Sequence, residues 1–292
     1  MTPRVVASGL KFPEGPVYLG DGVVAVAEMQ GGSVARVTAD GTVTRFTGLG
    51  GGPNGAALGH DGAIYVANNG GLSARTDGKG YWYAEEQFDG RVQRIDPDGT
   101  VTTVADQLPG EAPHRPNDLC FGPDGRLYVT DSRNWEDMRN LQPGRIVAIA
   151  PDGAVAQLAE VPAMPNGIAF GPSGDKLFVA QTLTRKILVY PWSATAGLGE
   201  PEVFCQLPGG SPDGLCFDAD GNLYVCGSLG HAIYVFDPTG QLRRTIETEP
   251  GSQPTNCCFG DGTLYVTYSM FGQLVAYDLG VAGLPLYEGG GR

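Results

Sequence analysis

Long hydrophobic runs are missing from this chain of 292 residues. Its beginning, Met1-Thr-Pro-Arg-Val-Val, holds no apolar run of signal-peptide length, and no later stretch approaches the length of a membrane span. We therefore expect a soluble, cytoplasmic protein with no membrane partner. Its six cysteines would be reduced in that compartment, because a chain of this size can bury a core without disulfides.

Charged residues are also scarce, at 17% of the chain, and basic residues are the scarcer kind. The 32 acidic and 19 basic residues give a formal net charge of −13. Such an acidic surface repels phosphate backbones and anionic lipids. We therefore expect no nucleic-acid partner.

Several motifs of common functional classes are absent. The three histidines and six cysteines form no Cys-x-x-Cys or His-x-x-x-His pair, which argues against zinc-finger and thioredoxin-like proteins. There is no Gly-x-Ser-x-Gly elbow and no phosphate-binding loop. These absences argue against a serine hydrolase of that type and against a nucleotide-binding enzyme.

Glycine and proline are abundant instead, with 46 and 22 residues respectively. Both residues are unfavourable inside helices, so a protein of long helices is excluded. The apolar fraction of 41% is near normal, which excludes a disordered chain. The composition predicts short strands joined by many tight turns.

The sequence contains six related units, each opening with a proline followed by a polar residue. The opening pairs are Pro13-Glu14, Pro53-Asn54, Pro116-Asn117, Pro165-Asn166, Pro212-Asp213 and Pro254-Thr255. Later in most units an Asp-Gly turn precedes an apolar run, as in Asp124-Gly125 before Leu127-Tyr128-Val129. Asp-Gly between such runs is a strong hairpin signal.

Four antiparallel strands per unit, repeated six times, predict an all-β fold, a six-bladed β-propeller that occupies residues 1–292 as one domain. Each blade is too small to bury its own faces, so neighbouring blades must pack together. Two terminal segments, residues 3–8 and 282–287, resemble outer strands. Either one could complete the last blade.

The polar residue after each proline stands where the innermost strand of its blade begins. A propeller brings these six side chains around one opening on its axis, and all six carry oxygen. Two of them, Glu14 and Asp213, are carboxylates, so the set suits a hard divalent cation. The alternative is that these residues only cap turns, as Asn and Asp often do, although Glu14 is a poor mimic of such a cap.

Two connections on the same end of the propeller are long. One runs from Asn69 to Asp89 and contains Tyr81-Trp82-Tyr83, and the other runs from Ser132 to Pro143 and contains Trp135. Long loops in a compact domain are usually functional, and we expect these two to wall the opening. Surface decoration is the alternative. His114 is expected to be a solvated loop residue rather than a catalytic base.

An ordered set of motifs resembles the senescence marker protein (regucalcin)/gluconolactonase family over nearly the whole chain. The motifs are Pro13-Glu14-Gly15-Pro16, Arg115-Pro116-Asn117-Asp118, Pro165-Asn166-Gly167, Pro212-Asp213-Gly214 and Asn256-Cys257-Cys258-Phe259-Gly260. The resemblance implies lactone hydrolysis and one divalent cation on the axis, with Ca²⁺ the first choice and Zn²⁺, Mn²⁺ or Mg²⁺ as alternatives.

Specific residues follow from the resemblance by position. Glu14, Asn166 and Asp213 resemble the metal ligands, and Asn117 resembles either a fourth ligand or a substrate contact. Arg115 and Asp131 resemble substrate contacts, and we add Asn54 of the ring to that group.

The sequence therefore predicts a metal-dependent hydrolase that opens a sugar-acid lactone. The cation would polarise the lactone carbonyl, and Asp213 would activate water or attack directly. One alternative is a phosphotriesterase-like hydrolase that uses the same metal site. Another is a propeller that binds a ligand without catalysis, since propellers host many functions. The oligomeric state is left open.

Overall fold

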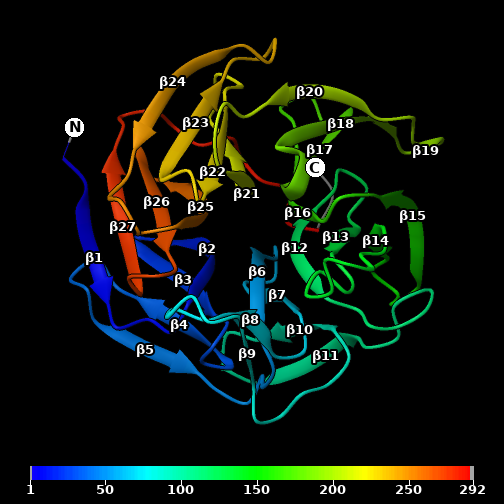
Figure 1. Ribbon diagram of the computed structural model, residues 1–292, viewed down its shortest axis with the longest axis horizontal. Coiled ribbons are helices and arrows are strands. Elements are labelled where there is room, and N and C mark those ends of the chain that lie inside the picture. Colours follow the sequence, from blue (N-terminus) through cyan, green and yellow to red (C-terminus); the bar gives the residue numbers. More distant parts are fainter. Residues whose placement is uncertain (1, 290–292) are drawn as a thin grey trace.

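The computed structural model describes residues 2–289 and confirms the six-bladed β-propeller (Figure 1). The first blade holds β2 (Pro13–Gly20), β3 (Val23–Glu28), β4 (Ser33–Val37) and β5 (Val43–Phe46). The second holds β6 (Pro53–Leu58), β7 (Ile64–Asn68), β10 (Arg91–Ile95) and β11 (Val101–Ala105). The third holds β12 (Pro116–Phe121), β13 (Leu127–Asp131), β14 (Gly144–Ile149) and β15 (Val155–Val161).

The fourth blade adds a short strand to this pattern. It holds β16 (Pro165–Phe170), β17 (Lys176–Gln181), β18 (Lys186–Ser193) and β20 (Glu202–Gln206), with β19 (Gly197–Leu198) also paired to β18. The fifth holds β21 (Ser211–Phe217), β22 (Leu223–Ser228), β23 (Ala232–Phe236) and β24 (Leu242–Glu247). The sixth holds β25 (Pro254–Gly260), β26 (Thr263–Tyr268), β27 (Gln273–Asp278) and β1 (Arg4–Ser8).

The N-terminal segment closes the ring. β1 pairs antiparallel with β27, with Arg4 opposite Ala276 and Ala7 opposite Leu274. The other candidate for this position, residues 282–287, forms no outer strand. Gly283 makes an isolated bridge to Asp218 instead, and the residues after it line a cavity on the axis.

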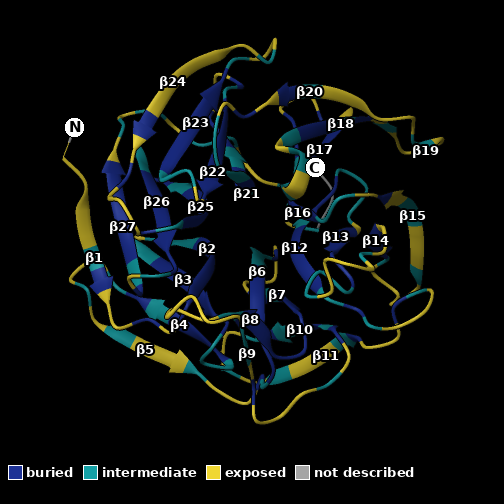
Figure 2. Cartoon of the chain, in the orientation of Figure 1, coloured by how far each residue is buried: buried dark blue, intermediate teal, exposed yellow. Residues whose placement is uncertain are grey.

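Burial follows the position of each strand in its blade (Figure 2). The second and third strands of the blades are almost wholly buried, as in β14, whereas the outermost strands β5 and β24 are largely exposed. The core lies between neighbouring blades. Phe178 of the fourth blade, for example, packs edge to face on Phe217 of the fifth at 5.0 Å between ring centroids.

The predicted turns are confirmed. Gly125 adopts a φ of 77° in the turn between β12 and β13, a conformation that favours glycine. In the turn between β21 and β22, Asn222 donates its main-chain N–H to Asp218 Oδ1 at 2.8 Å. Among the described residues the helical structure consists of one 3-10 turn, Thr182–Thr184. These residues therefore contain no helix that is long and apolar enough to cross a membrane.

Candidate functional site

The six innermost strands stand around the axis in the order β2, β6, β12, β16, β21 and β25, with β25 returning to β2. In each blade the opening proline pairs with the end of the second strand, as Pro13 pairs with Glu28 and Pro116 with Asp131. The polar residue after each proline therefore has the same register in every blade. We call these six the axial ring: Glu14, Asn54, Asn117, Asn166, Asp213 and Thr255.

Burial and nearby negative charge raise the pKa of both carboxylates of the axial ring. Burial raises the pKa of Glu14 well above its usual range, and the negative charges of Asp213 and Asp118 raise it further. Burial also raises the pKa of Asp213 to about 8, with Asp118 adding to the rise while hydrogen bonds from Asn166 and Ser228 oppose it. Ionising both carboxylates together therefore costs free energy unless a bound cation compensates their negative charges.

The donor set of the axial ring fits a hard cation. It offers two carboxylates together with amide oxygens from asparagine, and such oxygen ligands are those that Ca²⁺ prefers. Within residues 2–289, no group of three or more His, Cys, Asp or Glu side chains is arranged to hold a metal. A cation here would therefore depend on the asparagines as well as on Glu14 and Asp213.

A second layer lies one residue further along the innermost strands. Four blades have glycine there, as at Gly55 and Gly214, whereas β12 and β25 have Asp118 and Asn256. A Cβ atom on Gly55 would overlap Asp118, and one on Gly214 would overlap Asn256, so these two side chains use the space that the glycines leave. Asn256 Nδ2 donates to Asp118 Oδ2 at 3.3 Å across the axis.

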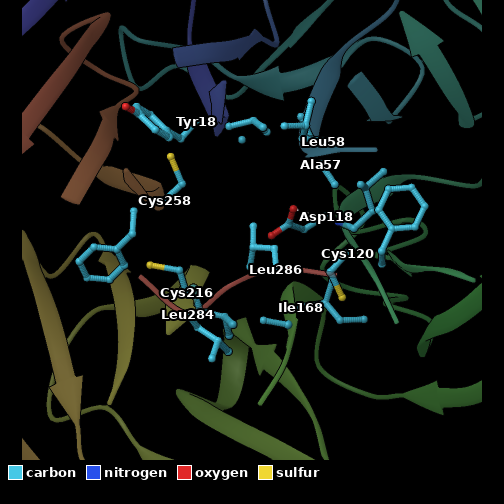
Figure 3. Close-up of a pocket in the computed structure, with 18 of the residues that line it drawn as sticks. Tyr18, Ala57, Leu58, Asp118, Cys120, Ile168, Cys216, Cys258, Leu284 and Leu286 are labelled. Carbon is cyan, nitrogen blue, oxygen red and sulfur yellow. Dashed lines mark hydrogen bonds between the residues drawn. The ribbon is translucent and has the colours of Figure 1, made fainter. Parts of the chain in front are cut away.

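We call the Asp118–Asn256 pair the axial floor. Burial raises the pKa of Asp118 to about 7. On the far side of the floor lies a cavity of about 280 Å³, whose lining begins with residues one position after the axial ring and includes Leu286 of the C-terminal segment (Figure 3). Our sequence reasoning missed the floor, although the break in the run of glycines at these two positions was visible.

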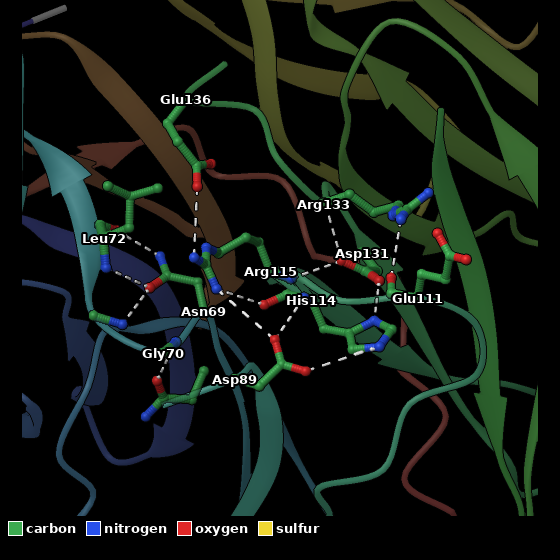
Figure 4. Close-up of polar contacts among 12 residues, drawn as sticks. Asn69, Gly70, Leu72, Asp89, Glu111, His114, Arg115, Asp131, Arg133 and Glu136 are labelled. Atoms are coloured by element: carbon green, nitrogen blue, oxygen red, sulfur yellow. Dashed lines mark hydrogen bonds and ion pairs between the residues drawn. The ribbon is translucent and has the colours of Figure 1, made fainter. Parts of the chain in front are cut away.

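The Asp131 carboxylate accepts a hydrogen bond from the main-chain N–H of Arg115 and so fixes the position of this residue (Figure 4). Asp131 is fully buried, and its Oδ1 accepts hydrogen bonds from the N–H groups of Arg115 at 2.7 Å and Arg133 at 3.0 Å. Its Oδ2 lies 2.9 Å from Nδ1 of His114 and 3.7 Å from Nη1 of Arg145. With its oxygens engaged in this way, Asp131 is arranged to position Arg115.

The expectation that His114 is solvated is wrong. Only 3% of this residue is exposed, because its ring packs into the network around Asp131. The main-chain N–H of His114 donates to Asp89 Oδ1 at 2.7 Å. The Arg115 side chain donates to the His114 carbonyl oxygen at 3.0 Å and lies 3.5 Å from Glu136 Oε1. Glu136 belongs to the long loop 132–143, so that loop helps to fix the guanidinium.

Other residues at the ends of second strands act as Asp131 does. Glu28 Oε1 accepts the N–H of Lys11 at 3.0 Å, and Asn68 Oδ1 accepts the N–H of Gly52 at 2.9 Å. Each bond fastens the loop that leads into the innermost strand of the same blade. These polar residues therefore set the positions of the axial ring members that follow the loops.

The two long loops meet. Residues 69–89 form a hairpin of β8 (Leu72–Ala74) and β9 (Tyr81–Tyr83), and Tyr81 packs edge to face on Trp135 of the other loop at 5.0 Å. Gln30 of the first blade donates to Ser73 Oγ at 2.8 Å and so anchors the hairpin. Trp82 lines an open groove of about 360 Å³ together with Lys11 and Met270.

Comparison with known proteins places this chain in a family. Over 91% of its length, the chain is 28% identical to a gluconolactonase from Zymomonas mobilis, of which the match covers 78%. A diisopropyl-fluorophosphatase from Loligo vulgaris is 30% identical over 59% of this chain and 60% of that protein. A regucalcin from Agrobacterium tumefaciens, described as a calcium-binding protein, shares the fold with a TM-score of 0.76 and 23% identity, over 100% of this chain and 97% of that one. Residues 12–270 match the SMP-30/Gluconolactonase/LRE-like region, so the chain belongs to the SMP-30/gluconolactonase family.

Proposed function

We propose that this protein is a lactonase that hydrolyses the ester of a sugar-acid lactone at the axial ring, with one bound divalent cation, Ca²⁺ by preference. The observation that carries the proposal is the placement of two carboxyl groups, Glu14 and Asp213, at the same register of the axial ring, where the negative charge of Asp213 raises the pKa of Glu14. Membership of the gluconolactonase family and the similarity to a named gluconolactonase support the reaction class.

Glu14, Asn166 and Asp213 would hold the cation, and Asn117 would be a fourth ligand or a substrate contact. When bound, the cation would supply Lewis-acid polarisation of the lactone carbonyl. In our proposal Asp213 accepts the proton of the attacking water, as a general base must.

Arg115 and Asn54 would orient the hydroxyl and carboxyl oxygens of the substrate. A guanidinium offers a fixed fork of donors, which suits the polyol or anionic groups of a sugar acid. The N–H of Arg115 is fixed by Asp131, and its side chain by the His114 carbonyl and Glu136. Asp131 would thus contribute by positioning Arg115, and direct contact with substrate stays a prediction.

A phosphotriesterase-like activity is a second candidate, because a relative with 30% identity is a diisopropyl-fluorophosphatase. Both activities can be measured on the same preparation. The test is hydrolysis of a panel of aldonolactones and of a fluorophosphate, with and without a chelator. Chelator-sensitive lactone turnover that exceeds fluorophosphate turnover supports our proposal. Turnover of neither class, with metal bound, would point to a propeller that binds a ligand without catalysis.

A further inference from the structure

Three thiols gather where the fifth and sixth blades meet, and no catalytic role at the axial ring uses them. Cys216 lies on β21, Cys226 on β22 and Cys257 on β25. The Sγ atoms of Cys216 and Cys257 are 3.3 Å apart, and both cysteines are free. A disulfide needs these two atoms about 1 Å closer.

The three thiols are not equivalent. Hydrogen bonds donated by Cys216 and Cys226 lower the pKa of Cys257 to about 5, although burial opposes the shift. Burial raises the pKa of Cys216 instead, as it raises that of the isolated Cys205 to about 12. The thiolate is the form of cysteine that attacks an oxidant, so we assign the attack to Cys257, whose sulfur has the Cys216 sulfur 3.3 Å away.

Space for a small oxidant adjoins the pair. Both Cys216 and Cys257 line the cavity of about 280 Å³ beyond the axial floor, and Figure 3 shows the Cys216 sulfur beside it. Hydrogen peroxide is little larger than water and fits easily into such a volume. It would reach the thiols on the side of Asp118 and Asn256 that faces away from the axial ring.

We propose that Cys216 and Cys257 form an oxidisable pair that a hydroperoxide converts into a disulfide between the innermost strands of neighbouring blades. The Cys257 thiolate attacks one peroxide oxygen, the O–O bond breaks, and the departing hydroxide takes up a proton to become water. Cys257 is then a sulfenic acid. The Cys216 sulfur attacks the Cys257 sulfur, the S–O bond breaks, and the hydroxyl leaves as a second water with the Cys216 proton. Two thiols and one peroxide thus give one disulfide and two waters.

The disulfide would tie β21 to β25 three residues beyond Asp213 and two beyond Thr255. It would connect positions 216 and 257, and a thiol reductant such as dithiothreitol would reverse it by exchange. The proposal concerns the thiols alone. It stands whether or not the axial ring hydrolyses lactones.

The test treats the folded full-length protein with a small excess of H₂O₂, then alkylates it under denaturing conditions and maps the peptides by mass spectrometry. We expect alkylated thiols to fall from six to four, with a Cys216–Cys257 linked peptide that dithiothreitol abolishes. Cys205→Ser, a buried cysteine outside the group, should leave the linkage unchanged. Cys216→Ser should stop at a Cys257 sulfenic acid, which dimedone traps.

The proposal is overturned if wild-type protein keeps all six thiols at peroxide levels that oxidise a free thiol peptide. It is equally overturned if the linked peptide joins a different pair, or if Cys257 proceeds to sulfinic acid while Cys216 remains a thiol. Circular dichroism of the Cys216→Ser variant checks its fold. The wild-type peptide map decides the matter even if that variant does not fold.

Discussion

Asn256 and Asp118 meet across the propeller axis, with Asn256 Nδ2 3.3 Å from Asp118 Oδ2. Their strands, β25 and β12, belong to opposite blades, since two other innermost strands separate them on either side of the ring. The pair therefore spans the channel directly beneath the axial ring. In our proposal the substrate approaches Asp213 from the face that carries the long loops, and the cavity that Asp118 and Asn256 line lies on the other side of this pair.

Closure of the ring by β1 predicts unequal effects of two changes in that strand. Ala7 is buried against Val24 and Leu274, whereas Val5 is 51% exposed. Ala7→Asp should lower the free energy of unfolding by roughly 3 kcal/mol, because it buries an unpaired charge. Val5→Asp should change it by less than about 1 kcal/mol. Urea unfolding of both variants measures this, and equal effects would mean that β1 does not close the sixth blade.

We expect the buried carboxylate of Glu28 to make a pH-dependent contribution to the stability of the fold. Its burial alone would raise the pKa, but hydrogen bonds from Arg45, the Lys11 N–H and Ser33 lower it overall. A lowered pKa in the folded state stabilises the protein above the unfolded pKa of about 4.3, and this stability is lost as the pH falls through the folded value. Arg45→Met should therefore cost about 2 kcal/mol at pH 7, and the difference from wild type should shrink between pH 5 and pH 3.

Arg243→Met is the matched control for that experiment. Arg243 is 66% exposed in its side chain and lies 3.7 Å from Asp237, and exposed pairs contribute little. The free energy of unfolding of the Arg243→Met variant should stay within about 0.5 kcal/mol of the wild-type value at every pH. A difference at Arg45 that does not depend on pH would show that Glu28 is not the group involved.

We expect substitution of Trp82 to change the substrate preference without loss of the fold. It lines the open groove beside Lys11, whereas its neighbour Tyr83 is 50% exposed and does not line that groove. Trp82→Ala should alter the ratio of kcat/KM between two aldonolactones by roughly tenfold, which corresponds to about 1.4 kcal/mol of differential contact. Tyr83→Ala should leave the ratio unchanged. If both variants keep the wild-type ratio of kcat/KM, the hairpin does not contribute to substrate preference.

The repeat is what made the fold predictable. Each proline with its polar neighbour opens an innermost strand, and Asp-Gly turns such as Asp124-Gly125 mark the hairpins, so local chemistry determined both the strand number and the axial ring. Closure was not decidable in this way. Residues 3–8 and 282–287 both resemble outer strands, and the pairing of Ala7 with Leu274 in space shows which of them closes the ring.

The surroundings of the site were harder to predict for a related reason. His114 looked like an exposed loop residue because its partner, Asp131, lies 17 residues later on the second strand of the blade. The floor depends on Asn256 and Asp118, which are 138 residues apart and meet only when the ring closes. Asp118 and Asn256 replace the glycine that the other four blades have at this position, but nothing local in the sequence shows that the two residues pair with each other.

The proposed cation predicts a gain of stability on binding. Protein stripped with EDTA should show a higher melting temperature when Ca²⁺ is added, because a ligand that binds only the folded state stabilises it, by about 2.7 kcal/mol at one hundred times Kd. Glu14→Gln should reduce that shift, since it removes one of the two carboxylates of the axial ring. An unchanged melting temperature with Ca²⁺, Zn²⁺, Mn²⁺ and Mg²⁺ alike would contradict the metal assignment.

Asn117→Ala separates binding from proton transfer at the same ring. It removes an amide that would contact the cation or the substrate but leaves Asp213 in place. We expect a higher KM or a weaker cation affinity, with kcat at saturating cation and substrate reduced by less than about tenfold. A loss of kcat as large as that caused by changing Asp213 would mean that Asn117 takes part in the chemical step.

The most direct test of the account is the rate of lactone hydrolysis by Asp213→Asn at saturating cation, with binding of the cation confirmed by elemental analysis. Asparagine keeps a carbonyl oxygen that can act as a ligand, as Asn166 would in the same ring, but its amide accepts no proton at neutral pH. Our account predicts that kcat falls by at least about a hundredfold while the cation stays bound. A cation-loaded variant that turns over its lactone at a rate near that of wild type would contradict it.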